Sequence, residues 1–414
     1  MKLLELELGA KAVLKHIRLA VAVARAAVAR VANMKNYSED LHTLADLGAV
    51  YLLLGSACNM SCKHCTQTPI KNCFDLSPQG KELSQEVKDF IVKWSKSLWK
   101  YGEHNPRRFY FWGGEPLLYW QTVKKLVLEF ESLGVNVSYR IFSNGLLLND
   151  EIVEFCNAHD IWFIMSYDAP NATAARNAVP SDTACKKFLQ IKKRNVNTVF
   201  NAINDDMVAA FKWLKAKFPN TFISCGFMNA LSESTPENLY KFGAGRVRKA
   251  VKDLHALMYA DTELAESIRN WFDTKYWRVD SWNKEEFTEY PFPPCHPGMV
   301  SISVNFNGDV VLCHNTDIAV GRITDDFAQL QEKHREKFKE LLPAQCTKCK
   351  HLDICRCICP IAVKRNNELI YCDFLREFWG AVKECCKPKK FNVQAGKSYT
   401  LKMVDGQMVL QEVK

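Results

Sequence analysis

Apolar runs and amphipathic stretches alternate between residues 48 and 230 of this chain. The runs are AVYLLLG, RFYFWG, VSYRIFSNG, WFIMSYD, TVFNAI and TFISCGFM. Each is short enough for one buried strand, and the stretches between them carry apolar residues near helical spacing. Strands that alternate with helices form parallel sheets with right-handed crossovers. The pattern therefore predicts an α/β fold, either an open sheet or a partial barrel, with ligands at the carboxyl ends of its strands.

Candidate functional residues follow the first four of these runs. ACNMSCKHC (57–65) follows the first run, GGEP (113–116) the second, SNG (143–145) the third and SYDAP (166–170) the fourth. Glycine and proline alone mark ordinary turns. Four such loops at the same edge of one sheet are better explained by a shared site.

Cysteine content and charge restrict the class of protein. The chain has 17 cysteines and no stretch typical of a secretion signal. In a reducing compartment this density indicates metal or redox chemistry rather than disulfides, so we predict a cytoplasmic protein. No apolar run approaches the roughly 18 residues of a membrane span. The basic residues behind the net charge of +9 are scattered, which does not favour nucleic-acid binding.

Cys58, Cys62 and Cys65 stand in a C-x₃-C-x₂-C spacing directly after the first predicted strand. Structural zinc sites use four protein ligands, whereas an open metal position is typical of a catalytic site. A cubane iron–sulfur cluster held by three thiolates has one iron without a protein ligand. Glu115, after the second strand, offers a carboxylate suited to the ammonium group of a bound amino acid.

This cysteine loop, together with GGEP after the second strand, resembles the radical S-adenosylmethionine (SAM) superfamily. The resemblance implies a partial (βα)6 TIM barrel and a [4Fe–4S] cluster whose open iron is chelated by SAM. It also implies reductive cleavage of SAM to a 5′-deoxyadenosyl radical, which abstracts hydrogen from a substrate. An electron donor such as flavodoxin or ferredoxin would reduce the cluster.

By the same resemblance, SAM is bound by residues of the four strand-end loops. These are His64, Gly113, Gly114, Glu115, Pro116, Ser143, Asn144, Ser166 and Asp168. His64 is expected beside the adenine. The position twelve residues after Ser166, where relatives often carry an arginine, is Ala178. Arg176 is therefore the candidate partner of the SAM carboxylate.

The cysteines of the second half are similar in order to a SPASM domain, which implies two auxiliary [4Fe–4S] clusters. The matching residues are Cys295, Gly308, Cys313, Cys346, Cys349, Cys355, Cys359 and Cys372. One cluster would be held by Cys346, Cys349, Cys355 and Cys372. The other would be held by Cys295, Cys313 and Cys359.

The second auxiliary cluster lacks an obvious fourth ligand. The candidates are Cys357, Cys385, Cys386 and His296. Alternatively, its iron is open to a substrate thiolate, which would favour a thioether product. The remaining cysteines are expected to be buried apolar fillers: Cys73, Cys156, Cys185 and Cys225.

The chain divides by pattern into five segments. They are an N-terminal helical extension (1–47), a radical SAM core (48–235), a helical bridge (236–294), a SPASM auxiliary-cluster domain (295–386) and a C-terminal tail (387–414). The tail is predicted to be a β-hairpin with Asp405-Gly406 at its turn. In residues 295–372 we expect few strands and a shape set by metal rather than by an apolar core.

SPASM-type relatives mostly modify peptides or proteins, so we predict a peptide maturase acting on a ribosomally made precursor, with a thioether crosslink as a candidate product. An alternative is a sulfatase-maturase-like enzyme that oxidises Ser or Cys to formylglycine. Such enzymes typically carry an aspartate directly after the cysteine matching Cys313, where this chain has His314, the candidate catalytic residue. They also tend to carry tyrosines where this chain reads TQTP. A second alternative is a non-catalytic iron–sulfur or zinc protein.

Overall fold

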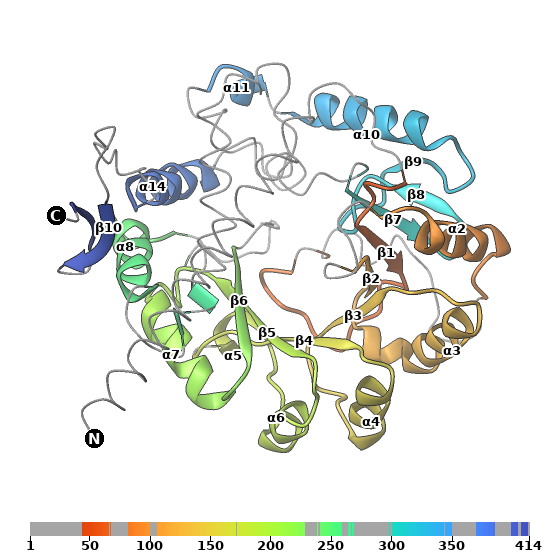
Figure 1. Ribbon diagram of the computed structural model, residues 1–414, viewed down its shortest axis with the longest axis horizontal. Coiled ribbons are helices and arrows are strands. Elements are labelled where there is room, and N and C mark those ends of the chain that lie inside the picture. Colours follow the sequence, from red (N-terminus) through yellow and green to blue (C-terminus); the bar gives the residue numbers. More distant parts are fainter. Residues whose placement is uncertain are drawn as a thin grey trace. The chain divides into compact units, whose positions relative to one another are not determined.

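The computed structural model contains a nine-stranded sheet (Figure 1). Every described residue belongs to one structural unit, formed by residues 42–285 and 289–414. The structure describes residues 44–65, 67, 82–99, 106–170, 172–227, 238, 241–258, 264–265, 267–268, 298, 300–342, 344–349, 370–385, 399–404 and 407–412.

Six strands of this sheet run parallel to one another in the order β6-β5-β4-β3-β2-β1. They are β1 (Ala49–Leu53), β2 (Arg108–Trp112), β3 (Ser138–Ser143), β4 (Trp162–Ser166), β5 (Arg194–Phe200) and β6 (Phe222–Phe227). The helices between and after them are α2 (Gln85–Lys96), η2 (Pro116–Tyr119), α3 (Trp120–Ser132), α4 (Asp150–Ala158), α5 (Ala172–Ala175), α6 (Asp182–Phe188), α7 (Met207–Lys217) and α8 (Arg246–Met258). The predicted parallel α/β fold is confirmed.

The parallel sheet has one apolar face and one polar, aromatic face. Phe109 and Phe111 of β2 are fully buried, and the ring of Phe109 contacts that of Phe130 on α3. Tyr110, between them, points the other way and stacks on Tyr51 of β1 with ring centroids 4.4 Å apart. Because side chains alternate along a strand, helices cover the apolar face and leave the other face to line the interior.

Three strands from the second half of the chain extend the same sheet. β7 (Ser301–Asn305) pairs in parallel with the whole of β1. β8 (Asp309–Val311) and β9 (Ala319–Arg322) continue the sheet in antiparallel orientation. Ile302 belongs to the same apolar core as the first six strands. The expectation of few strands and a metal-shaped segment is wrong for this part, because SISVN buries its apolar residues between β1 and β8.

Gly308, the glycine of the C-x₁₂-G-x₄-C pattern, forms the turn between β7 and β8. Its φ of +90° lies in the left-handed region, which favours glycine. The side-chain oxygen of Asn305 accepts hydrogen bonds from the backbone N–H groups of Asn307 and Asp309, at 3.0 and 2.9 Å. This part of the pattern therefore encodes a β-turn, after which the chain passes along β8 to Cys313.

The C-terminal half also contributes helices α10 (Phe327–Leu341), α11 (Ala344–Thr347) and α14 (Ile370–Cys385). On α8, which lies in the predicted bridge, Arg248 forms an ion pair with Glu384 of α14. The predicted C-terminal hairpin is present as the antiparallel pair β10 (Tyr399–Val404) and β11 (Gln407–Glu412).

The N-terminal extension up to residue 43, residues 269–297 of the bridge and the turn at 405–406 lie outside the described residues. The five segment boundaries therefore stay predictions. In the described ranges, no helix is both long enough and apolar enough to span a membrane.

Ile302→Ala tests whether β7 is part of the main folding unit. Ile302 is 1% exposed and lies beside β1, so the truncation should lower the free energy of unfolding by about 2–5 kcal/mol. Chemical denaturation should show this loss in the main transition. Leu98→Ala, at a residue that is 80% exposed, is the control and should change stability by less than about 0.5 kcal/mol. An early separate transition in Ile302→Ala would show that β7–β9 unfold independently.

Candidate active site

A cavity of about 360 Å³ opens at the carboxyl ends of the parallel strands. Its lining comes from the loops after β1 to β4, from β5 and β6, and from the loop after β8. The predicted site residues in the lining are Cys58, Cys62, His64, Cys65, Gly113, Gly114, Glu115, Ser143, Asn144, Ser166, Arg176 and His314. Two predicted SAM-binding residues are not among the described lining residues. Asp168 is fully buried and forms an ion pair with Arg176. Pro116 begins helix η2 directly after Glu115.

The other described residues that line the cavity were not predicted from the sequence motifs. These residues are Met60, Gln67, Trp112, Phe142, Asn197, Val199, Gly226 and Asn315. A sequence signal existed for Asn197, because RNVNTVF places Asn195 and Asn197 at alternate positions of β5. Alternate residues of a strand point to the same face, so two such amides indicate a polar interior.

The cysteine loop (57–65) is held by the segment that follows β4. The backbone N–H of Ser61 donates to Oδ1 of Asn177 at 2.8 Å. The backbone N–H of Lys63 donates to the carbonyl of Ala175 at 2.9 Å. These bonds fix the loop on either side of Cys62 before any ligand binds.

Gly113 and Gly114 bring the loop after β2 against the cysteine loop. Gly114 N–H donates to the carbonyl of Gly55 at 2.9 Å, and Glu115 N–H donates to that of Ala57 at 2.8 Å. A Cβ on Gly113 would lie 2.5 Å from the Gly55 oxygen, and one on Gly114 would lie 2.1 Å from the Ala57 oxygen. Both distances are too short for any side chain, so the two glycines are required by this close backbone approach.

Glu115 is buried at the base of the cavity, with 1% of its surface exposed. Its carboxylate accepts hydrogen bonds from Leu117 N–H at 3.0 Å, from Ser143 Oγ at 2.8 Å and from Asn144 N–H at 2.8 Å. Burial raises the pKa of Glu115 to about 6, although these three donors oppose the rise. A carboxylate offers about four acceptor positions, so one remains for a further donor such as an ammonium group.

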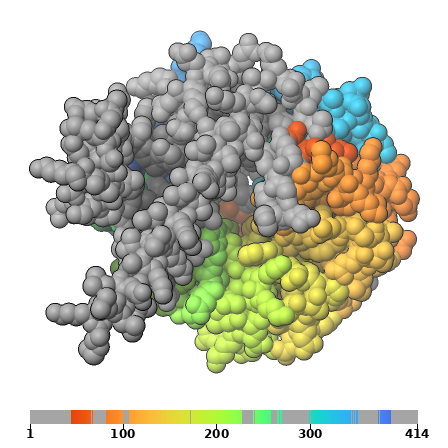
Figure 2. Space-filling model, in the orientation of Figure 1, coloured from red at the N-terminus to blue at the C-terminus, as the bar shows by residue number. Residues whose placement is uncertain are grey.

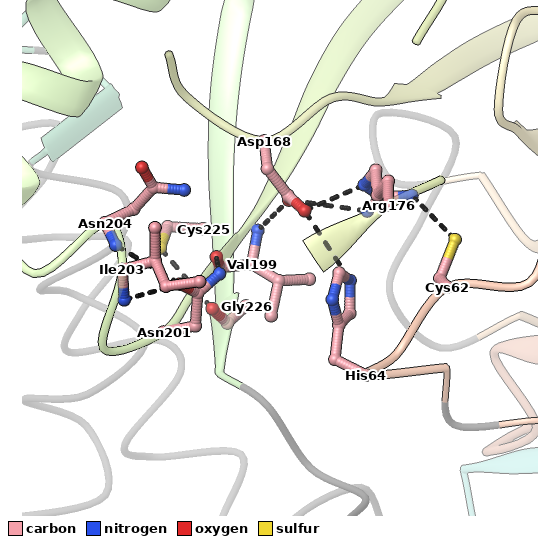
Figure 3. A network of polar contacts seen from close by, with 10 residues as sticks. All are labelled: Cys62, His64, Asp168, Arg176, Val199, Asn201, Ile203, Asn204, Cys225 and Gly226. Atoms are coloured by element: carbon pink, nitrogen blue, oxygen red, sulfur yellow. Dashed lines mark hydrogen bonds and ion pairs between the residues drawn. The ribbon is translucent and has the colours of Figure 1, made fainter. Parts of the chain in front are cut away.

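A buried polar network joins the loop after β4 to the cysteine loop (Figure 3). Arg176 Nε and Nη2 donate to the carboxylate of Asp168 at 2.8 and 3.4 Å. Arg176 Nη1 lies 3.9 Å from Sγ of Cys62. Asp168 also accepts from Val199 N–H at 2.9 Å and lies 3.6 Å from Nε2 of His64. The network therefore links three predicted SAM-binding residues, Arg176, Asp168 and His64, to one predicted cluster ligand.

The ionisation of this network follows from burial and the ion pair. Burial raises the pKa of Cys62 to about 11 against the lowering effect of Arg176, with smaller raising effects from the neighbouring thiols and Asp168. Burial lowers the pKa of His64 to about 4, although Asp168 opposes the change. Burial alone would raise the pKa of Asp168, but Arg176 holds it below its usual range. Asp168 likewise holds the pKa of Arg176 above its usual value despite burial.

The three cysteines of the loop are the predicted ligands of an iron–sulfur cluster. Among the residues that the structure describes, no three His, Cys, Asp or Glu side chains converge on a position suited to one metal ion. A cubane does not need such convergence, because each thiolate binds a different iron. Cys58, Cys62 and Cys65 form no disulfide and line the same cavity, and their role as cluster ligands stays a prediction.

His314 brings the second half of the chain into the same cavity. It follows Cys313 in the loop after β8, and its ring stacks on Tyr51 with centroids 4.3 Å apart. The ring of Trp112 contacts the His314 ring edge-on, with the two centroids 4.4 Å apart. Burial lowers the pKa of His314 to about 4. The candidate catalytic residue is thus held as a neutral imidazole in the cavity wall.

The second cysteine set is described only in part. Cys346 lies in α11 and Cys349 follows the end of that helix, and Cys349 N–H donates to the Cys346 carbonyl at 3.0 Å. Cys372 lies in the first turn of α14 and Cys385 ends it, thirteen residues later, or about 20 Å along the helix. The remaining candidates lie outside the described residues: Cys295, His296, Cys355, Cys357, Cys359 and Cys386. Both auxiliary ligand sets therefore stay predictions.

The predicted filler cysteines can be checked at three positions. Cys156 and Cys185 are buried in the apolar core, as expected. Cys225 lies half-buried on β6 and packs against that core. Cys73 lies outside the described residues.

Residues 52–243 match the model of the radical SAM superfamily. The chain contains a radical SAM domain. The radical SAM cyclopropyl synthase TigE of Paramaledivibacter caminithermalis is 22% identical over 350 residues, which cover 80% of this chain and 72% of TigE. A serine-type anaerobic sulfatase-maturating enzyme of Bacteroides thetaiotaomicron is 22% identical over 347 residues, covering 74% of this chain and 81% of that enzyme.

Solved structures share the fold. The structure of anSMEcpe with bound AdoMet has a TM-score of 0.56 and 18% identity, over 82% of this chain and 98% of that one. SuiB of Streptococcus suis, bound to its precursor peptide SuiA, has a TM-score of 0.52 and 14% identity, over 81% and 76% of the two chains. The radical SAM resemblance is confirmed, and the chain is a radical SAM enzyme related to peptide and protein maturases.

Gly114→Ala tests the close approach that builds the site. Because the new Cβ would lie 2.1 Å from the Ala57 carbonyl, the cysteine loop must shift, and reconstituted protein should lose most of its SAM-dependent EPR signal. Gly226→Ala is the matched control, since it also lines the cavity but its Cβ would lie 3.9 Å from its neighbour. Equal iron content and equal signal in both variants would contradict the steric argument.

Proposed function

We propose that this enzyme is a peptide maturase that modifies a ribosomally made peptide or protein. The observation that carries the proposal is the convergence of Cys58, Cys62, Cys65 and Glu115 on one cavity at the strand ends. Peptide substrates are supported by the similar solved structures, which include anSMEcpe with a bound Cp18Cys peptide and SuiB with its precursor peptide. The cytoplasm, with flavodoxin or ferredoxin as electron donor, suits a protein whose described cysteines form no disulfide.

Some residues of the cavity would bind the cluster and SAM, and others would contact the substrate. Cys58, Cys62 and Cys65 would hold the [4Fe–4S] cluster, and Glu115 would accept from the ammonium of SAM beside the backbone of Gly113-Gly114. The bound cluster and SAM supply a 5′-deoxyadenosyl radical for hydrogen abstraction. The protein orients the substrate and excludes water from the cavity.

The lining away from the cysteines is suited to an uncharged substrate side chain. It includes Asn197, Val199, Gly226 and Asn315, with His314 between aromatic rings. Neutral His314 would orient the substrate by hydrogen bonding, since a pKa of about 4 disfavours its protonated form. A thioether product would require that one hydrogen atom leave carbon and end in 5′-deoxyadenosine, and that a cysteine thiol lose a proton to solvent. The one electron that remains would be left for a predicted auxiliary cluster.

Formylglycine formation is the second candidate, supported by the similarity to a serine-type sulfatase-maturating enzyme and to anSMEcpe. Against it stand His314, in place of the expected aspartate, and the sequence TQTP after Cys65. The two products differ chemically. Thioether formation removes a free thiol that iodoacetamide would otherwise alkylate, whereas formylglycine carries an aldehyde that reacts with hydrazides.

Replacing Cys58, Cys62 and Cys65 together with Ala tests the proposed chemistry. Wild-type protein, reconstituted without oxygen and reduced with dithionite, should convert SAM to 5′-deoxyadenosine. The triple variant should lose about four irons per chain, one cubane, and should form no 5′-deoxyadenosine. Iron analysis and chromatography of the products measure both effects.

The matched control is the double variant Cys156→Ala/Cys185→Ala, which removes two buried cysteines that are not predicted ligands. It should retain both the iron and SAM cleavage. The proposed function fails if the triple variant still cleaves SAM, or if its iron content equals that of the control.

Glu115→Gln should weaken SAM binding without removing iron. One charge-assisted hydrogen bond is worth about 1.5–3 kcal/mol, so the affinity should fall roughly ten- to a hundredfold. Only the ionised carboxylate would hold the ammonium, and the pKa of Glu115 is raised to about 6. Wild-type affinity should therefore decline as the pH falls below about 6, while the affinity of the variant should stay flat. Equilibrium dialysis with labelled SAM measures both.

Ser143→Ala is the matched control for Glu115→Gln. It removes a hydroxyl that donates to Glu115 at 2.8 Å but leaves the negative charge in place. It should lower the SAM affinity less than Glu115→Gln and keep the pH dependence. Normal SAM binding by Glu115→Gln would assign this carboxylate a purely structural role as the cap of η2.

A further inference from the structure

Arg176 stands where the cysteine loop meets the segment after β4 (Figure 3). It is 8% exposed, which is unusual for a guanidinium group. Nε and Nη2 donate to Asp168 at 2.8 and 3.4 Å, and Nη1 lies 3.9 Å from Sγ of Cys62. The ion pair is therefore oriented, with its cationic end toward a predicted cluster ligand.

We propose that Arg176 is a positioning residue that raises the reduction potential of the cluster held by Cys58, Cys62 and Cys65. Asp168 acts through it by holding the guanidinium against Cys62. The inference rests on the proposed function, because it requires a cluster at this cysteine loop. It adds an electrostatic role for two residues otherwise expected only to contact SAM.

The physical argument concerns the electron that the cluster must accept. Reduction transfers one electron from a low-potential reductant to the cluster and makes the site more negative. A positive charge and an N–H directed at a ligand sulfur both stabilise the reduced form. Solvent screens this charge weakly, because Arg176 is buried. Asp168 opposes the effect, but Arg176 lies between Asp168 and Cys62 (Figure 3).

If Arg176 instead binds the SAM carboxylate, replacing it should have a different effect on the reduction potential. A guanidinium has five N–H donors, and three of them are directed at Asp168 and Cys62. If the remaining donors bind SAM, loss of Arg176 weakens SAM affinity but leaves the potential of the SAM-free cluster unchanged. If Arg176 sets the potential, the change is present without SAM.

The test is the reduction potential of Arg176→Met in the reconstituted full-length protein without SAM. We expect the equilibrium constant for reduction to fall about tenfold, which is ~59 mV for one electron. EPR-monitored redox titration measures it, and the spectrum of the Cys58/Cys62/Cys65→Ala variant is subtracted to remove other clusters. Arg176→Lys, which keeps the charge, should restore part of the shift.

Asp168→Asn provides a change of opposite sign. It keeps an oxygen acceptor for Arg176 but removes the negative charge, so the potential should rise. The matched control is Arg246→Met, because Arg246 makes the same fork with Asp205, at 2.7 and 3.2 Å, but on the exposed start of α8. Its potential should equal that of the wild type.

The proposal is overturned if Arg176→Met and wild type have equal potentials, whatever happens to SAM affinity. If Arg176→Met does not hold iron, the potentials of Arg176→Lys and Asp168→Asn decide the question. The proposal is overturned if both variants have the potential of the wild type, or if both shift the potential in the same direction. Failure of the proposed function is distinguishable, since the triple cysteine variant would then keep its full iron content and leave no difference spectrum.

Discussion

The backbone contact between Gly113-Gly114 and the cysteine loop is the constraint on which the site depends. β1 and β2 run in parallel, and the hydrogen bonds from Gly114 and Glu115 carry their pairing past the ends of the strands. This pairing places a buried carboxylate beside three thiols. Any side chain on either glycine would push the two loops apart. The geometry of the cofactor site is thus set by main-chain packing before polar contacts refine it.

A second consequence of the sheet is that both halves of the chain form one cavity. β7 pairs with β1 on the side opposite β2, and the antiparallel β8 runs back until Val311 lies level with Ser303 and with Tyr51 of β1. His314 therefore stacks on Tyr51 of β1 and contacts Trp112 of β2. The cysteine-rich half supplies a wall of the reaction chamber as well as predicted cluster ligands.

The parallel strands and the strand-end motifs were predictable because each depends on local sequence. Short apolar runs predicted β1 to β4, and the C-x₃-C-x₂-C and GGEP spacings marked the loops after β1 and β2. The strand β7 was not predicted, because five residues with serines on one face give a weak signal among the cysteines. The contact of Arg176 with Cys62 was also missed, since it joins residues 114 positions apart that only the folded sheet brings together. A resemblance had assigned Arg176 to SAM, and the buried ion pair with Asp168 is visible only in three dimensions.

The pairing of β1 with β7 also affects how the chain is made. Ser301, which pairs with Ala49, follows it by 252 residues. At roughly 5–20 residues per second, a ribosome needs roughly 13–50 seconds to synthesise the chain between them. During that time the edge of β1 that later pairs with β7 has no neighbouring strand. Unpaired strand edges can form hydrogen bonds with other chains. The nascent enzyme therefore passes through an interval in which its central strand is open to aggregation, and a fragment ending before β7 would remain in that state.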